Sequence, residues 1–238
     1  MRISWNSMKL AVGAAAILAA AGAATAQFGP MGGMGGASAF RGIWSPTVGQ
    51  GGEYQIDQKN GRNSGPSDMT IAIVGKEDVS GQPGVWMEIT TKEPRSGNTM
   101  YMKFLVVTNG GTNQNVKMIM QQPPQPPMEM DLNGGQMMGH GRAAQPQSSD
   151  VSKEGKDLGV ETITVPAGTF SCEHYQSAEG DDVWVSKTVS PWGLVKMTGK
   201  DTDMVLEKVI TDAHDMITGT PQVFQMPNVG GMGGPPQH

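Results

Sequence analysis

Methionine is the residue type whose abundance could support chemistry in this chain. The sequence holds 19 methionines, and only two of them fall within the first 26 residues. The methionine thioether is a soft ligand that suits Cu(I). One short stretch gathers four of these side chains and a histidine, and the candidate ligands are Met128, Met130, Met137, Met138 and His140. An alternative interpretation is that methionine supplies adaptable apolar surface, because its side chain is flexible and polarizable.

Cys172 is the single cysteine, and it lies two residues before His174. In a strand both side chains would point to the same face, where a thiol beside an imidazole could act as a nucleophile pair. Alternate residues of a strand lie ~7 Å apart, however, which is long for a direct hydrogen bond. A lone cysteine also cannot form a disulfide within the chain. We therefore expect Cys172 to be buried and inert.

The sequence carries none of the common catalytic signatures. It lacks a Gly-x-Ser-x-Gly nucleophile turn, a His-Glu-x-x-His zinc motif, a glycine-rich phosphate loop and a Cys-x-x-Cys pair. We therefore expect a protein that is not an enzyme and that uses no cofactor. Its activity would then be binding.

Strand patterns dominate the second half of the chain. Residues 161–165 alternate between polar and apolar side chains, and Pro166-Ala167-Gly168 then interrupts the pattern with turn residues. The alternation resumes directly after this turn, which predicts a hairpin. The expected strands of this half cover residues 161–165, 169–176, 183–186, 193–198 and 204–211.

The first half carries the same kind of pattern. Asn109-Gly110-Gly111 is a hairpin-turn signal between two apolar runs. The expected strands of this half cover residues 53–56, 69–74, 85–90, 100–107 and 116–120. Many short strands at regular spacing predict an antiparallel sheet, so the expected fold class is mainly β.

Three segments have a composition too poor in large apolar residues to offset the entropy of ordering them. They are a Gly/Met-rich lead (residues 27–41), a Pro/Met-rich insertion (121–150) and a Gly/Met/Pro-rich tail (216–238). We expect all three to be flexible. A single β domain is then expected over residues 42–215, with the insertion between its two halves.

Residues 1–26 have the layout of a secretory signal peptide. Arg2 and Lys9 precede a short Ala/Gly-rich apolar run, and Ala24-Thr25-Ala26 supplies a small-residue cleavage site. The run is too short for a membrane span, which needs ~20 residues. We predict cleavage after Ala26 and a periplasmic or secreted product that does not span the membrane.

The charge of the processed chain argues against two classes of partner. Removal of the leader leaves 15 basic and 22 acidic residues, a net charge of −7. Nucleic acids and anionic membrane surfaces would repel such a protein. The expected partners are an apolar small molecule or lipid, or a protein of the cell envelope.

Three stretches of the second half carry a family resemblance. They are VPAGTF at residues 165–170, VWVS at 183–186 and SPWGLVKM at 190–197. Together they resemble exported bacterial proteins of the lipoprotein-carrier (LolA/LolB-like) half-barrel superfamily, over roughly residues 42–210. The resemblance implies a curved antiparallel sheet that wraps over helices and shelters apolar material, usually a lipid or an acyl chain. It assigns a role to no individual residue.

An apolar concave face of such a half-barrel would form the binding wall. Alternation along the expected strands selects the wall residues Met87, Ile89, Met102, Phe104, Met118, Met120, Phe170 and Val185. A shift of one residue in register would move every side chain to the other face. The expected function is non-catalytic binding of a lipid, an acyl chain or another apolar ligand, or of an envelope partner. The alternatives are a methionine-rich Cu(I)-binding protein and an envelope scaffold without a ligand.

Overall fold

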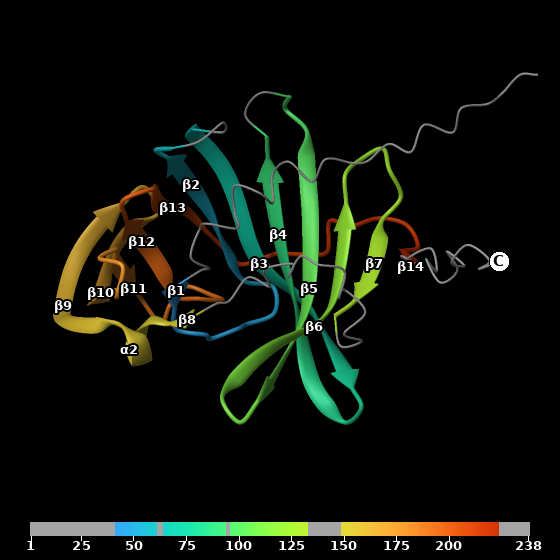
Figure 1. Ribbon diagram of the computed structural model, residues 1–238, viewed down its shortest axis with the longest axis horizontal. Coiled ribbons are helices and arrows are strands. Elements are labelled where there is room, and N and C mark those ends of the chain that lie inside the picture. The colour runs from blue at the N-terminus through green and yellow to red at the C-terminus, as the bar shows by residue number, and fades with distance from the viewer. Residues whose placement is uncertain (1–40, 61–63, 94–95, 133–148, 224–238) are drawn as a thin grey trace, which may run out of the picture.

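The computed structural model describes residues 41–60, 64–93, 96–132 and 149–223. Within these ranges the chain is mainly β and forms one large, open antiparallel sheet (Figure 1). The fold class expected from the sequence is therefore confirmed. The predicted signal peptide, its cleavage after Ala26, nearly all of the lead segment, and residues 133–148 and 224–238 lie outside the described residues.

The first half of the sheet is a meander in which each strand pairs with the next one along the chain. Its strands are β2 (Gly51–Gln58), β3 (Gly65–Val79), β4 (Gln82–Lys92), β5 (Thr99–Asn109), β6 (Thr112–Gln121) and β7 (Met128–Asp131). The turn between β5 and β6 uses Gly110 and Gly111, both with positive φ, as the sequence predicts. The β3–β4 and β5–β6 hairpins extend beyond the rest of the sheet at the bottom of Figure 1.

The second half is also a meander, and it joins the first through its last strand. Its strands are β9 (Lys156–Val165), β10 (Gly168–Gln176), β11 (Asp182–Val185), β12 (Leu194–Thr198) and β13 (Thr202–Ile210). β13 pairs antiparallel with β2, so the two halves form a single sheet. The Tyr54 hydroxyl on β2 donates a hydrogen bond to the Leu194 carbonyl across this junction, at 3.1 Å. The expected five-strand pattern and its turn at Pro166–Ala167 are confirmed.

The short elements lie where the sequence predicts flexible segments, and the structure differs from the expectation there. β7 lies within the Pro/Met-rich insertion, and β14 (Gln222–Val223) lies within the predicted tail. These two strands pair in parallel and form one end of the sheet. β7 is stabilised by its neighbour β6, because Met130 and Met128 lie opposite Met118 and Met120. Tertiary pairing therefore orders a segment whose own composition favours flexibility.

Helix is nearly absent from the described residues. The only helix there is α2 (Val151–Glu154), which follows β8 (Ser149–Asp150) and is capped by the Asp150 side chain. β8 pairs in parallel with β1 (Arg41–Gly42). The described ranges contain no helix that is long and apolar enough to cross a membrane. They also contain no helix of the kind over which the resemblance predicts the sheet to wrap.

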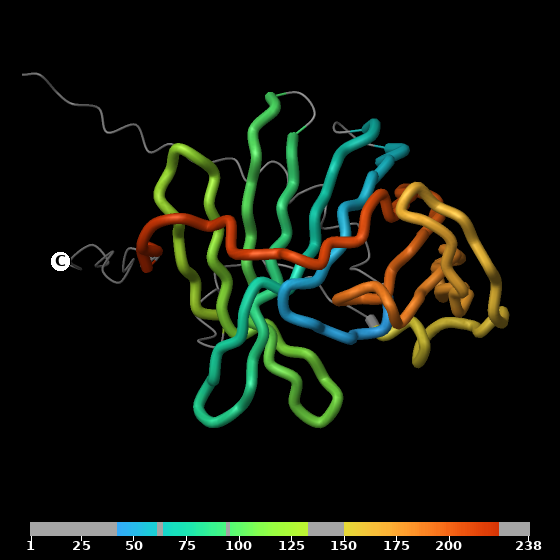
Figure 2. The backbone as a smooth tube through the Cα atoms, turned by 180° about the vertical axis from the view of Figure 1, so that it is seen from behind, coloured from blue at the N-terminus to red at the C-terminus, as the bar shows by residue number. Residues whose placement is uncertain are grey.

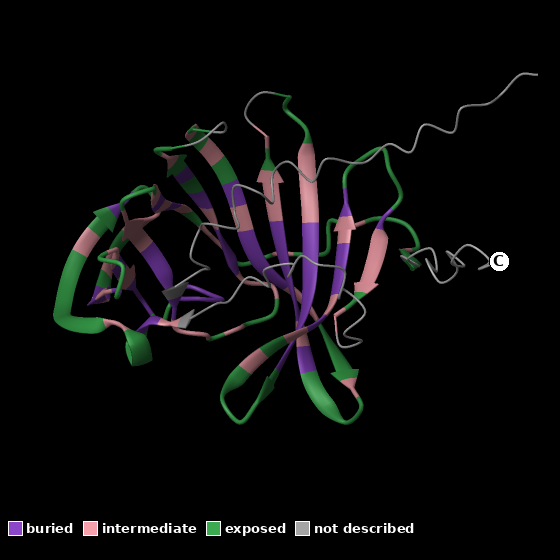
Figure 3. Ribbon diagram, in the orientation of Figure 1, coloured by how far each residue is buried: buried purple, intermediate pink, exposed green. Residues whose placement is uncertain are grey.

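Buried residues lie along the strands of both halves (Figure 3), and their apolar side chains form two clusters. The larger cluster occupies one face of the first half, here called the main face, where it includes Ile71 and Met87. It continues into the second half, where it includes residues from both sides of the sheet, such as Cys172 and Val185. The smaller cluster, the second face, comprises Trp86, Leu105, Val107, Val116 and Ile119. Trp86 and Met87 are adjacent in β4 and belong to different clusters, because successive side chains of a strand point to opposite faces.

Residues 211–221, here called the C-terminal strap, cross the sheet after β13 (Figure 2). The Ala213 N–H donates to the Gly49 carbonyl at 2.9 Å. Gln121 and Thr218 exchange two hydrogen bonds, at 3.0 and 3.1 Å, and Ile217 packs against the second face. The strap thus covers part of the second face and leads the chain to β14.

Candidate binding surface on the main face

All eight predicted wall residues belong to the larger cluster or pack against it, but Phe170 lies on the opposite side of the sheet from Val185, because Val185 pairs with Glu173. Six of these side chains are buried and belong to the cluster itself, while Met120 and Phe170 are half-buried and pack against it. Strand pairing places the six residues of β4, β5 and β6 on one face. The buried wall residues are Met87, Ile89, Met102, Phe104, Met118 and Val185.

Strand pairing explains why the wall residues of the first half are contiguous. Met87 on β4 lies opposite Phe104 on β5, which in turn lies opposite Met118 on β6. Ile89, Met102 and Met120 form a second row beside the first, across the same three strands. Side chains that lie opposite one another on adjacent strands contact directly, since their Cβ atoms are ~4.5–5.5 Å apart. Phe170 and Val185 lie on β10 and β11, in the other half of the sheet.

Two methionines of β7 extend these rows to a third pair of strands. Met130 lies opposite Met118, and Met128 lies opposite Met120. The sequence places both residues in a segment expected to be flexible, and assigns them only to the Cu(I) alternative. A usable signal was present, because Met128 and Met130 repeat the Met-x-Met spacing of Met118 and Met120, which is the period of a strand.

Cys172 and His174 do not form a nucleophile pair. The Cys172 thiol is fully buried, and burial, together with the charge of Glu161, raises its pKa to about 11. The His174 Nδ1 lies 2.9 Å from Glu161 Oε1, and its Nε2 lies 3.1 Å from Asp182 Oδ1. The ring also stacks on Trp184, with 4.3 Å between centroids. Both imidazole nitrogens are therefore already hydrogen-bonded, and neither residue is arranged to activate the other.

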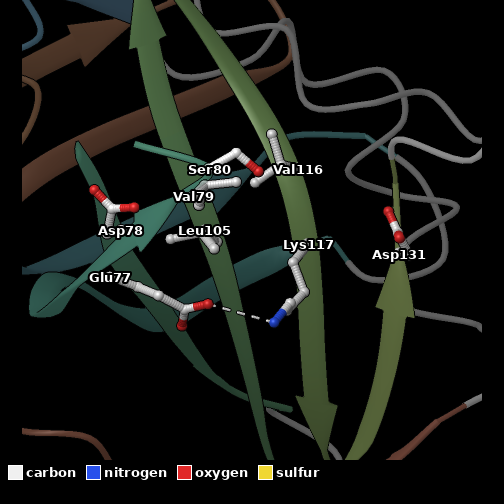
Figure 4. Close-up of a pocket in the computed structure, with 8 residues that line it drawn as sticks. All are labelled: Glu77, Asp78, Val79, Ser80, Leu105, Val116, Lys117 and Asp131. Atoms are coloured by element: carbon white, nitrogen blue, oxygen red, sulfur yellow. Dashed lines mark ion pairs between the residues drawn. The ribbon is translucent and has the colours of Figure 1, made fainter. Parts of the chain in front are cut away.

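A pocket of about 300 Å³ lies on the second face, near the ends of the two long hairpins (Figure 4). Its floor is apolar, but Lys117 crosses it and forms an ion pair with Glu77 at 3.5 Å. The Trp86 indole N–H donates to the same Glu77 carboxylate at 2.9 Å. The lining residues are Glu77, Asp78, Val79, Ser80, Leu105, Val116, Lys117 and Asp131. Such a charged lining does not suit an apolar ligand, and it lies on the opposite face from the predicted wall.

A cluster of charged side chains on the second face fastens the strap, and sequence reasoning missed it. Glu88 accepts from the Met216 N–H and is hydrogen-bonded to Asp215, which forms an ion pair with Lys103. Burial raises the pKa of Glu88 to about 7, although the Met216 N–H opposes the shift. The available signal was the position of Glu88 and Lys103, two charged residues within otherwise apolar strands.

The described residues hold no group of three or more histidine, cysteine, aspartate or glutamate side chains that could bind a metal ion. Of the predicted Cu(I) ligands, Met128 and Met130 are on β7. Met137, Met138 and His140 lie outside the described residues. The structure therefore brings two of the five together and leaves the other three without a position.

Comparison with known proteins assigns no family to this chain. No protein-family model matches it, and no curated protein matches it. One similar solved structure is a candidate lipoprotein from Parabacteroides distasonis, with 13% identity, a TM-score of 0.33 and coverage of 71% of this chain and 98% of that chain. Another is a candidate exported protein with a YmcC-like fold from Bacteroides fragilis, with 11% identity, a TM-score of 0.33 and coverage of 71% and 99%. Similarity at this level does not establish a shared fold, and the lipoprotein-carrier resemblance stays a prediction.

Proposed function

We propose that this protein is an exported, non-catalytic binding protein that holds the acyl chain of a lipid against the main face. The observation that carries the proposal is the apolar cluster itself, which continues across both halves of the open sheet. Its margins remain accessible, because Met100, Met120 and Met130 are only half-buried. Covering such surface with an acyl chain would contribute ~25 cal/mol per Å² of apolar area removed from water.

The side chains at this margin favour a flexible, apolar ligand over a rigid one. Methionine is long and unbranched, so neighbouring methionines can change rotamer to follow ligands of different shape. Phe170 and Trp184 are half-buried aromatic residues that pack against the same cluster, but they lie on the opposite side of the second half from Val185. The proposed acyl chain therefore follows the margin of the first half, where Met100, Met120 and Met130 lie.

The experiment is binding of a fluorescent long-chain fatty acid to the mature protein, after organic extraction and mass spectrometry of the protein purified from its own envelope. A co-purified lipid and saturable fatty-acid binding are expected. Met120→Glu and Met130→Glu should each weaken the binding at least tenfold, because a carboxylate at the margin would have to be desolvated. Val160→Glu is the matched control, since Val160 is 71% exposed on β9 and lies outside the cluster.

Two outcomes would contradict this function. If the two main-face variants bind the fatty acid as tightly as Val160→Glu, the ligand does not lie on the main face. If the purified protein carries no lipid and binds no fatty acid, the apolar face is filled from within the protein or by an envelope partner, and a scaffold role is favoured.

A further inference from the structure

We infer that the two Met-x-Met pairs of β6 and β7 form a binding site for Cu(I). The pairs are Met118 with Met120, and Met128 with Met130. The sheet brings them together, since Met118 lies opposite Met130 and Met120 lies opposite Met128, with no bulge between these positions. Of the five ligands that sequence proximity suggests, this site keeps Met128 and Met130, and two methionines of the neighbouring strand take the place of the other three.

The backbone geometry allows the four thioethers to converge. Residues that lie opposite one another on antiparallel strands have Cα atoms ~4.5–5.5 Å apart, and alternate residues of one strand lie ~7 Å apart. The four Cα atoms therefore mark the corners of a small rectangle on one face of the sheet. Each methionine has three side-chain torsions about which its sulfur can turn toward the centre of that rectangle.

The positions of these residues relative to solvent suit an ion that must enter and leave. Met118 is buried, with 6% of its surface exposed, whereas Met120, Met128 and Met130 are half-buried. A fifth thioether, that of Met102, lies opposite Met120 on β5. The four positions around the rectangle thus all carry thioethers, and their neighbours on the same face of β5 are Met102 and Phe104.

The chemistry of the ligands selects the ion. Thioethers are soft and uncharged, and soft sulfur ligands favour Cu(I) over hard divalent cations such as Mg²⁺ and Ca²⁺. A thioether carries no proton in the physiological range, so it does not compete with protons for the metal as histidine and cysteine do. Binding at this site should therefore vary little between pH 5 and 8. A site that used His140 would lose affinity toward the acid end of this range.

The test is anaerobic titration of the full mature chain with Cu(I) against a competing chelator, followed by NMR of the methionine methyl groups. One tightly bound Cu(I) is expected, and it should shift the methyl signals of Met118, Met120, Met128 and Met130. The double variant Met120→Leu, Met130→Leu should weaken Cu(I) at least tenfold. Met69→Leu and Met204→Leu are matched controls, because both methionines are buried in the main-face cluster on other strands.

Three results would overturn the inference. They are a protein that does not compete with the chelator, unchanged affinity in the double variant, and loss of binding in Met137→Leu, Met138→Leu or His140→Ala while the double variant still binds. The inference does not depend on the proposed function. Leucine preserves the apolar surface, so fatty-acid binding should survive Met120→Leu and Met130→Leu even where Cu(I) binding is lost.

Discussion

The carboxylate of Glu88 accepts hydrogen bonds from the backbone N–H of Met216, at 3.3 Å to Oε1 and 3.2 Å to Oε2. The two residues lie on β4 and on the C-terminal strap, 128 positions apart. Glu88 also shares a hydrogen bond with Asp215, and Asp215 forms an ion pair with Lys103. The strap is therefore attached to the sheet through two neighbouring carboxyl groups, those of Glu88 and Asp215.

The first prediction concerns the pH dependence of the strap. Burial raises the pKa of Glu88 from 4.5 to about 7, so its contribution to stability is complete below 4.5 and is lost as the pH rises through 7. Burial acts to raise the pKa of Asp215, but the hydrogen bond and charge of Lys103 hold it below 3.8, so its contribution is lost as the pH falls through that lower pKa. The strap should be most firmly held between the lowered pKa of Asp215 and the raised pKa of Glu88, where Glu88 is protonated and Asp215 is ionised.

Hydrogen exchange at the backbone amides of residues 213–218 measures how firmly the strap is attached to the sheet at each pH. Protection should fall between pH 6 and 8 by more than the intrinsic exchange rate predicts. The other charged groups on this face include Glu77, Lys117, Glu129 and Asp131, and Lys117 forms ion pairs with both glutamates. Glu88→Gln should remove the step near pH 7, because glutamine does not titrate. A step of equal size in this variant would assign the titration to another group.

The second prediction concerns Gln121, whose amide exchanges hydrogen bonds with the Thr218 backbone N–H and carbonyl. Its side chain is buried, with 7% exposed. Gln121→Leu should lower the free energy of unfolding by ~1–3 kcal/mol, because it leaves two backbone groups of the strap without partners. Urea denaturation measures the change, and the exposed neighbour Gln122→Leu is the control. Equal stability of the two variants would mean that the strap contributes little to the fold.

The main strands could be predicted from the sequence because their signals are local. Alternation marks each strand, and glycine or proline marks each turn, as at Gly110 and Pro166. The same alternation selected six wall residues that share one face of β4, β5 and β6, whereas Phe170 and Val185 lie on opposite sides of the sheet. The strand prediction is therefore confirmed wherever one short window contains the information.

The strap and the end of the sheet could not be predicted because their partners are distant. β7 is ordered by its pairing with β6, although the prolines between the two strands favour flexibility. The charged cluster joins Glu88 and Lys103, which are 15 positions apart, to a segment more than 110 positions further along the chain. Single-sequence patterns carry no information about such contacts.

The third prediction separates two glycines that look alike in the sequence. A Cβ at Gly51 would lie 2.4 Å from the Ile71 carbonyl oxygen and 2.7 Å from the Ala72 Cα, where backbone atoms of β3 cannot yield. A Cβ at Gly75 would meet nothing closer than 3.8 Å. Gly51→Ala should therefore cost ~1–3 kcal/mol or more through strain, whereas Gly75→Ala should be neutral or stabilising. Thermal unfolding of the two variants compares them, and a similar loss in both would refute the steric argument.

The fourth prediction concerns the reactivity of Cys172. Its side chain is fully buried on β10, and burial together with the nearby Glu161 carboxylate raises its pKa to about 11. Because the thiolate is the reactive form, the folded protein at pH 8 should react with a thiol reagent at least ~100-fold more slowly than the urea-unfolded chain. Glu161→Gln should lower the pKa, but reaction should stay slow because the thiol remains inaccessible. Rapid labelling of the folded wild-type protein at pH 8 would show that this region opens, and would return Cys172 to consideration as a nucleophile.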